Sequence, residues 1–146
     1  ANLIKDEIYN LAKKGSTIIF STHRMEQVEE ICDHIVLVNL GKKVLDGSVS
    51  EIKQQFKEYI FAIETSHPEL IKDNALFSII DKADKNPNKV LVKLSQSVAS
   101  NEVLKYLIEQ NIPIISYNEV LPSLNDIFIQ LVEGTHAKAR AFQNIK

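Results

Sequence analysis

The sequence has 146 residues, of which 45% are hydrophobic and 25% are charged, and its formal net charge is −2. This composition predicts one ordinary globular domain or two small ones, and it lacks the basic excess of a nucleic-acid or membrane-surface binder. The single cysteine, Cys32, excludes an intramolecular disulfide, and no run of about 18 apolar residues predicts a membrane-spanning helix.

The first segment combines a helix with an apolar strand. Apolar residues at helical spacing predict a helix from Leu3 to Lys14, with Gly15 as its C-terminal stop. Residues Thr17–Phe20 are β-branched or aromatic without alternation, which predicts a strand covered on both faces. A helix followed so closely by such a strand is typical of an α/β protein with a parallel sheet.

A second helix and strand follow. The helix is predicted from Arg24 to Cys32, and its glutamates are expected on a solvated face rather than in a metal site: Glu26, Glu29 and Glu30. Ile35–Val38 is predicted as a second buried strand, after which Lys43–Leu45 returns as a hairpin strand and Asp46-Gly47 turns the chain.

The chain from Ser48 onward has a different pattern. Ser48 and Glu51 form a capping-box sequence, and the boundary of the first domain (residues 1–47) is placed at the connecting helix, residues 48–57. Strands are predicted in four places: Tyr59–Glu64, Phe77–Ala83, Val90–Leu94 and Ile112–Tyr117. One or two helical turns are expected within Pro68–Asp73, a helix ends near Asn111, and a last helix runs from Leu124 to a stop at Gly134. This order predicts a small α+β, ferredoxin-like domain over residues 58–133, followed by a frayed tail, residues 134–146.

His23 is the sharpest candidate for chemistry. It follows the predicted strand Thr17–Phe20, and the carboxyl ends of strands in open α/β sheets are where ligands bind. An imidazole there can donate one hydrogen bond to a phosphate oxygen, and the hydroxyls of Ser21 and Thr22 lie beside it in sequence. The alternative is a structural histidine that satisfies a strand-to-helix turn.

Other site types find no support in the sequence. None of the remaining histidines stands at metal-ligand spacing from a cysteine or another histidine, so no metal site is predicted. No serine lies in a nucleophile elbow. The four glycines, Gly15, Gly41, Gly47 and Gly134, do not form a phosphate-binding loop of the P-loop type.

The stretch T-I-I-F-S-T-H-R-M-E-Q-V-E-E-I-C-D-H-I-V-L-V-N-L-G-K-K-V-L-D-G closely resembles the switch-histidine region of ATP-binding cassette (ABC) transporter ATPases. The resemblance covers about residues 16–47. Residues 48–133 resemble, more loosely, the C-terminal extension of ABC-2-type, drug- or sodium-export-like ATPases, whose last helix commonly reads S-L-E-D-I-F. Here that motif is Ser123-Leu124-Asn125-Asp126-Ile127-Phe128, with asparagine in place of glutamate.

This resemblance implies a function for a longer parent protein. His23 would be the switch histidine that contacts the γ-phosphate of ATP, framed by Ser21 and Thr22. The parent would use ATP and Mg²⁺, pair with a second ATPase subunit, and couple hydrolysis to a membrane permease at the cytoplasmic face of the membrane. The fold implied for residues 1–47 is the C-terminal piece of a P-loop NTPase-type parallel sheet.

The family's other nucleotide-binding motifs are missing from the sequence. The P-loop, Q-loop, signature sequence, Walker B strand and D-loop would lie upstream of Ala1, which is not an initiator methionine. The chain is therefore expected to be a C-terminal fragment that binds no cofactor and is inactive alone. Because the strand Thr17–Phe20 would lack neighbours, the fragment is expected either to self-associate or to be disordered before about residue 48. The alternative is a stand-alone regulatory, dimerisation or small-ligand-binding module built on residues 58–133.

Overall fold

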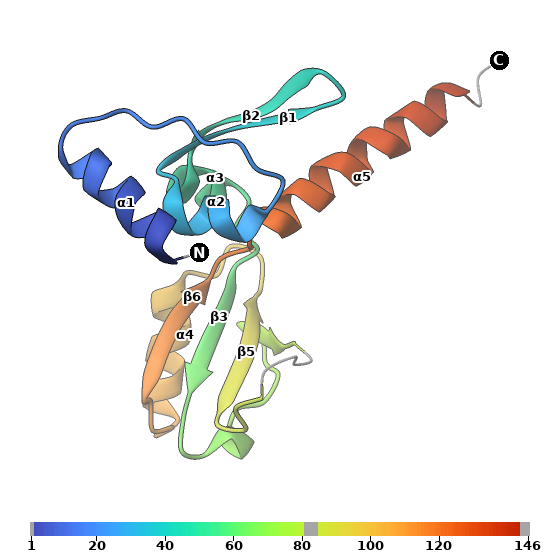
Figure 1. Cartoon of the computed structure of the whole chain (residues 1–146). Coiled ribbons are helices and arrows are strands. Elements are labelled where there is room, and N and C mark those ends of the chain that lie inside the picture. The colour runs from blue at the N-terminus through green and yellow to red at the C-terminus, as the bar shows by residue number, and fades with distance from the viewer. Residues whose placement is uncertain (1, 81–84, 144–146) are drawn as a thin grey trace. The chain divides into compact units, whose positions relative to one another are not determined.

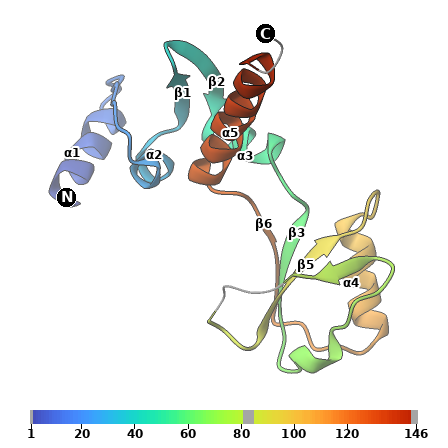
Figure 2. The same cartoon turned by 90° about the vertical axis from the view of Figure 1, so that its right-hand side faces the viewer.

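The computed structural model describes residues 2–80 and 85–143, which form an α/β fold of two compact units (Figures 1 and 2). The first unit is Ala1–Lys53 with Ser123–Lys146, and the second is Gln54–Pro122. The chain thus leaves the first unit after Lys53 and returns to it at Ser123. The domain limits expected from the sequence, with a connecting helix at residues 48–57 and a small α+β domain at residues 58–133, stay a prediction.

Helix α1 (Asn2–Lys13) lies where the apolar spacing predicts it. It ends in a Schellman motif, in which the Gly15 N–H donates to the Ala12 carbonyl at 3.0 Å and the Ser16 N–H to the Leu11 carbonyl at 3.2 Å. Gly15 adopts φ +90°. Such left-handed backbone is readily available only to glycine, so the prediction of Gly15 as the stop is confirmed.

The predicted strand at Thr17–Phe20 does not form. These residues have no regular secondary structure, and the Ile19 side chain is 95% exposed. In the described residues both sheets are antiparallel, and no strand of either sheet pairs with residues 17–20. A β-branched sequence acquires strand geometry only by pairing, so the expectation of a buried, parallel strand is wrong for this structure.

The hairpin of the first unit joins β1 (His34–Asn39) to β2 (Lys42–Ser48) after helix α2 (Met25–Ile31). Its two-residue turn has φ 51° at Leu40 and φ 71° at Gly41, the signs of a type I′ turn. The position of the strand at 35–38 is confirmed, but its predicted burial on both faces is wrong. Val36 and Val38 are more than half exposed, because within the described residues β1 and β2 pair only with each other.

Helix α3 (Val49–Gln55) begins with the predicted cap, since the Glu51 N–H donates to Ser48 Oγ at 3.1 Å. Asp46-Gly47 does not turn the chain as expected, because both residues lie within β2.

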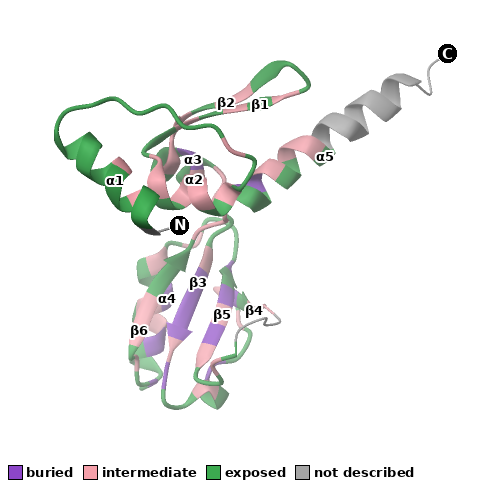
Figure 3. Ribbon diagram, in the orientation of Figure 1, coloured by how far each residue is buried: buried purple, intermediate pink, exposed green. Residues whose placement is uncertain are grey.

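The second unit is a four-stranded antiparallel sheet in the order β4-β5-β3-β6. Its elements are β3 (Ile60–Glu64), the 3-10 helix η1 (Pro68–Leu70), β4 (Phe77–Ile79), β5 (Lys89–Leu94), α4 (Ser100–Glu109) and β6 (Ser116–Val120). Buried residues concentrate on β3, β5 and α4 (Figure 3), with Ile63, Val92 and Leu107 fully enclosed in one apolar cluster. The strand predicted at Tyr59–Glu64 from its alternating pattern is thus confirmed as β3, which begins at Ile60.

Two elements of the second unit depart from their predicted limits. Strand β4 is shorter than Phe77–Ala83, and residues 81–84 lie outside the described residues. Strand β6 begins four residues later than predicted, because Asn111 takes φ 54° as the helix stop and Pro113 has no N–H for a ladder. The apolar Ile112 packs in the core instead.

Helix α5 (Leu124–Gln143) is longer than predicted. It passes through Gly134, so the expected stop at that residue and the expected frayed tail of residues 134–146 are wrong up to Gln143. Residues 144–146 lie outside the described residues. A helical glycine costs only about 1 kcal/mol relative to alanine. The sequence Ala137-Lys138-Ala139-Arg140-Ala141 then supplies strong helix formers.

Candidate functional site

The turn that carries His23 is held by Thr22. The Thr22 Oγ1 atom accepts the Arg24 N–H at 3.0 Å and donates to Gln27 Oε1 at 3.3 Å, which links the turn to helix α2. Thr22 is half-buried, whereas Ser21 and His23 are exposed. Thr22 therefore has a local structural role, and the His23 imidazole is left accessible to a partner.

The three predicted site residues are adjacent in sequence, and the structure places them in this turn rather than at a strand end. An exposed imidazole can donate a hydrogen bond to an anionic oxygen. One exposed imidazole fits a single contact to a nucleotide rather than its whole binding site.

The histidines His34 and His67 each contact an exposed carboxylate. His34 Nε2 lies 2.7 Å from Asp46 Oδ1, and Lys43 Nζ lies 3.2 Å from Asp46 Oδ2. The hydrogen bonds from His34 and then Lys43 lower the pKa of the Asp46 carboxyl below its ordinary value. His67 Nδ1 lies 3.0 Å from Glu69 Oε1. Exposed pairs of this kind add little to the free energy of unfolding. In residues 2–80 and 85–143, no group of three or more His, Cys, Asp or Glu side chains lies close enough together to hold a metal ion.

Two of the glutamates assigned to a solvated face have specific partners. Glu30 pairs with Lys5, and its carbonyl accepts the Tyr9 hydroxyl at 2.8 Å, which joins α1 to α2. Glu29 pairs with Lys53 at 2.9 Å and also accepts the Leu124 N–H. Sequence spacing could not reveal these contacts, because the partners of Glu29 lie 24 and 95 residues away.

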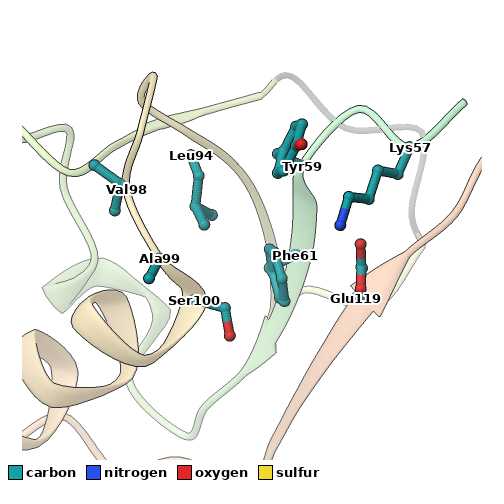
Figure 4. A pocket seen from close by; sticks show the side chains of 8 residues that line it. All are labelled: Lys57, Tyr59, Phe61, Leu94, Val98, Ala99, Ser100 and Glu119. Atoms are coloured by element: carbon teal, nitrogen blue, oxygen red, sulfur yellow. The ribbon is translucent and has the colours of Figure 1, made fainter. Parts of the chain in front are cut away.

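The second unit has an open pocket of about 300 Å³ (Figure 4). Its apolar wall includes Phe61 and Leu94, and the Lys57 side chain reaches toward Glu119 across it. The Lys57 Nζ atom also lies 5.0 Å from the centroid of the Tyr59 ring. Tyr59 has φ 58°, unusual for an aromatic residue. The pocket therefore combines an apolar surface with two opposite charges.

Comparison with known proteins connects both units to one family. Residues 47–132 match the family described as the C-terminal domain of DrrA1-3-like ATP-binding proteins. An uncharacterized ABC transporter ATP-binding protein of Alkalihalophilus pseudofirmus is 30% identical over 138 residues, which are 94% of this chain and 50% of that protein. The Bacillus subtilis protein YhaQ, also an uncharacterized ABC transporter ATP-binding protein, is 30% identical over 136 residues, 92% of this chain and 44% of YhaQ.

A shorter match reaches higher identity. The methionine import ATP-binding protein MetN of Pasteurella multocida is 45% identical over 51 residues, 32% of this chain and 15% of MetN. The chain spans about half the length of the first two relatives. With the matched domain covering more than half of its residues, the chain belongs to the ABC transporter ATP-binding proteins and contains the C-terminal domain of their DrrA1-3-like family.

Proposed function

We propose that the chain acts within the ATP-binding subunit of an ABC transporter, in which ATP hydrolysis drives membrane transport. The observation that carries this proposal is the exposed His23 in a turn fixed by Thr22, within a chain whose relatives are named ABC transporter ATP-binding proteins. The complete subunit would use ATP with Mg²⁺, which supplies charge neutralisation on the phosphates.

In this role the His23 imidazole donates a hydrogen bond to the γ-phosphate and helps to orient the attacking water. Thr22 holds the turn through its contacts with Arg24 and Gln27, and Ser21 would frame the imidazole from the preceding position in sequence. A charge-assisted hydrogen bond made in the transition state contributes about 1.5–3 kcal/mol, equivalent to roughly 10- to 150-fold in rate. His23 is thus the residue of this chain assigned to catalysis.

The chain alone is proposed to be inactive. Its four glycines form no phosphate-binding loop, and one histidine cannot replace the backbone N–H groups and lysine of such a loop. Isothermal titration of ATP and Mg²⁺ into the 146-residue chain is expected to show no micromolar binding. Micromolar affinity would contradict this proposal.

The proposed partners are a membrane permease and a second ATPase subunit, at the cytoplasmic face of the membrane. None of the helices described in residues 2–80 and 85–143 has the length and apolarity to cross a membrane. Large apolar side chains of the first unit are strongly exposed: Leu3, Ile4, Ile19, Val38 and Leu40. Such exposure favours association, so the isolated chain is expected to sediment as more than a monomer, and a monodisperse monomer would refute that expectation.

The domain arrangement is part of the proposal. Residues 1–47 would complete a P-loop NTPase-type sheet in the full subunit, and residues 48–57 would connect it to an accessory domain of residues 58–133. The element order of that domain and its antiparallel sheet support a ferredoxin-like, split βαβ topology.

A second candidate function is small-ligand binding by the accessory domain, favoured by the pocket between Lys57 and Glu119. Opposite charges beside Phe61 suit a zwitterion with an apolar group. Free phenylalanine is a suitable probe, with the Lys57→Ala variant as comparison. A saturable thermal shift in the parent chain that is lost in the variant would establish this function, and no shift at millimolar phenylalanine would count against it.

The main proposal is tested by ATP hydrolysis in a complete subunit carrying His23→Ala. A strongly reduced turnover is expected, and a turnover equal to that of the parent would overturn the assignment of His23.

A further inference from the structure

Glu29, near the C-terminal end of α2, uses both oxygens of its carboxylate. The Oε2 atom lies 2.9 Å from the Lys53 ammonium, and the Oε1 atom accepts the backbone N–H of Leu124. The Glu29 and Lys53 side chains are only 26% and 23% exposed. Water therefore screens this ion pair less than it screens the exposed pairs of His34 and His67.

The partners of Glu29 occupy special places along the chain. Lys53 is the last residue of the first unit before the chain enters the second, and Ser123 is the first residue after it returns. Leu124 follows directly and begins helix α5. One carboxylate on α2 thus binds both chain segments through which the second unit is inserted.

The contact with Leu124 also completes the start of α5. The Asp126 N–H donates to Ser123 Oγ at 3.1 Å, and the Ser123 N–H lies 3.4 Å from Asp126 Oδ2, as in a capping box. That box leaves the Leu124 N–H, one of the unpaired donors of a first helical turn, without an acceptor of its own. Glu29 supplies the acceptor, and its negative charge suits a helix N-terminus.

Buried apolar side chains belong to the same helices as the partners of Glu29. Ile52 beside Lys53 is 2% exposed, Leu124 is 3% exposed and Ile127 is fully buried. In the described part of the first unit these are the only large apolar side chains in the buried class. The first unit is therefore best packed where α3 and α5 carry the partners of Glu29.

We propose that Glu29 is a positioning residue that fastens α2, and with it the turn carrying His23, to the two segments that bear the second unit. The link from Glu29 to the turn is short, because Gln27 on α2 contacts Thr22 at 3.3 Å. The assignment of a catalytic consequence rests on the proposed function of His23. The fastening itself rests only on the contacts of Glu29.

Amide hydrogen exchange on the full 146-residue chain tests the fastening. Glu29→Ala removes both contacts, and the matched control is Glu26→Ala, an exposed glutamate of the same helix. We expect exchange of the Leu124 amide to rise about tenfold or more in Glu29→Ala and to stay unchanged in the control, while amides of β3 and β5 keep their protection. Unchanged exchange at Leu124 in Glu29→Ala would overturn the proposal.

A charge exchange separates the two contacts. The double variant Glu29→Lys with Lys53→Glu restores an ion pair between α2 and α3 but gives Leu124 no acceptor. Protection of the α3 amides is expected to return in the double variant relative to Glu29→Lys alone, whereas the Leu124 amide stays fast. Failure of the α3 amides to regain protection in the double variant would contradict the role of the ion pair.

Hydrolysis by the complete subunit tests the consequence for His23. Glu29→Ala is expected to lower kcat several-fold with ATP affinity unchanged, and to have no further effect when His23 is already alanine. An equal loss in both backgrounds would show that Glu29 does not act through His23 and would overturn its positioning role. If His23→Ala alone leaves kcat unchanged, the proposed function fails, while the exchange result at Leu124 still decides the fastening.

Discussion

The Tyr117 hydroxyl donates a hydrogen bond of 3.0 Å to the Ser100 carbonyl, which joins edge strand β6 to the first turn of α4. The Tyr117 ring also stacks on Phe61 of β3, with centroids 5.1 Å apart and an interplanar angle of 17°. One side chain thereby connects the edge of the sheet, its centre and the helix that covers it.

Tyr117→Phe should remove the hydrogen bond and keep the stacking. We expect the free energy of unfolding of the second unit to fall by about 0.5–1.5 kcal/mol, measured by urea unfolding. Tyr117→Ala should cost more, because the stacking is lost as well. Equal stability of the parent and Tyr117→Phe would show that the hydroxyl contact contributes nothing.

Burial raises the pKa of Tyr117 above its ordinary value. A raised pKa means that the folded state favours the neutral phenol, so this contribution is present below pH 10 and is lost as the pH rises through the folded-state pKa. Unfolding experiments at pH 9 and 11 should show a steeper decline for the parent chain than for Tyr117→Phe. The same decline in both would contradict the assignment.

Leu107 on α4 should be essential to the core, whereas its neighbour Ile108 should not. Leu107 is fully buried and Ile108 is 62% exposed. Leu107→Ala is expected to lower the unfolding free energy by about 2–5 kcal/mol, because it deletes buried methyl groups and leaves a cavity. Ile108→Ala, the matched control, should change it by about 0.5 kcal/mol or less. Similar losses from the two variants would show that α4 packs through a different face.

Leu40 is the wrong residue type for its backbone, and its replacement should stabilise the hairpin. It has φ 51°, its side chain is 75% exposed, and it precedes Gly41 in the turn. Leu40→Asn creates the sequence preferred by type I′ turns and is expected to gain about 0.5–1 kcal/mol. Protection of the β1 and β2 amides from exchange should rise, and Leu40→Val should lower it. A loss of protection in Leu40→Asn would mean that the turn is of another type.

Cys32 should react slowly with alkylating agents near neutral pH. Burial, and then the charge of Asp33, raise the pKa of its thiol, which lowers the fraction of reactive thiolate. The rate of iodoacetamide modification at pH 8 is expected to be lower in the folded chain than in urea, and to recover as the pH rises. A folded chain that reacts as fast as the unfolded one would contradict the partial burial of Cys32.

Local signals predicted the elements whose structure is decided locally. Gly15 ends α1 and Ser48 caps α3, because each depends on neighbours a few positions away. The alternating residues 60–64 form β3, for which β5 and β6 supply the pairing strands. The segment Thr17–Phe20 failed for the opposite reason, since a strand needs a partner that its own sequence does not specify. Pro113 was a local signal that could have placed the start of β6 correctly.

The candidate site was predictable only in part. Ser21, Thr22 and His23 are consecutive, so the sequence itself brings them together, and the turn adds the contacts of Thr22 with Arg24 and Gln27. Glu29 could not be recognised, because it has no motif and its partners Lys53 and Leu124 are brought to it by folding. Its position on a helix of mixed polarity indicated only a solvated glutamate.

The most direct test of the central claim is steady-state hydrolysis and separate ATP binding by complete subunits that carry His23→Ala or the control His67→Ala. Both residues are exposed histidines, but only His23 lies in the turn fixed by Thr22. We predict that His23→Ala lowers kcat by roughly 10- to 150-fold with little change in ATP affinity, and that His67→Ala keeps the parent turnover. Equal turnover in the parent and His23→Ala would contradict the account.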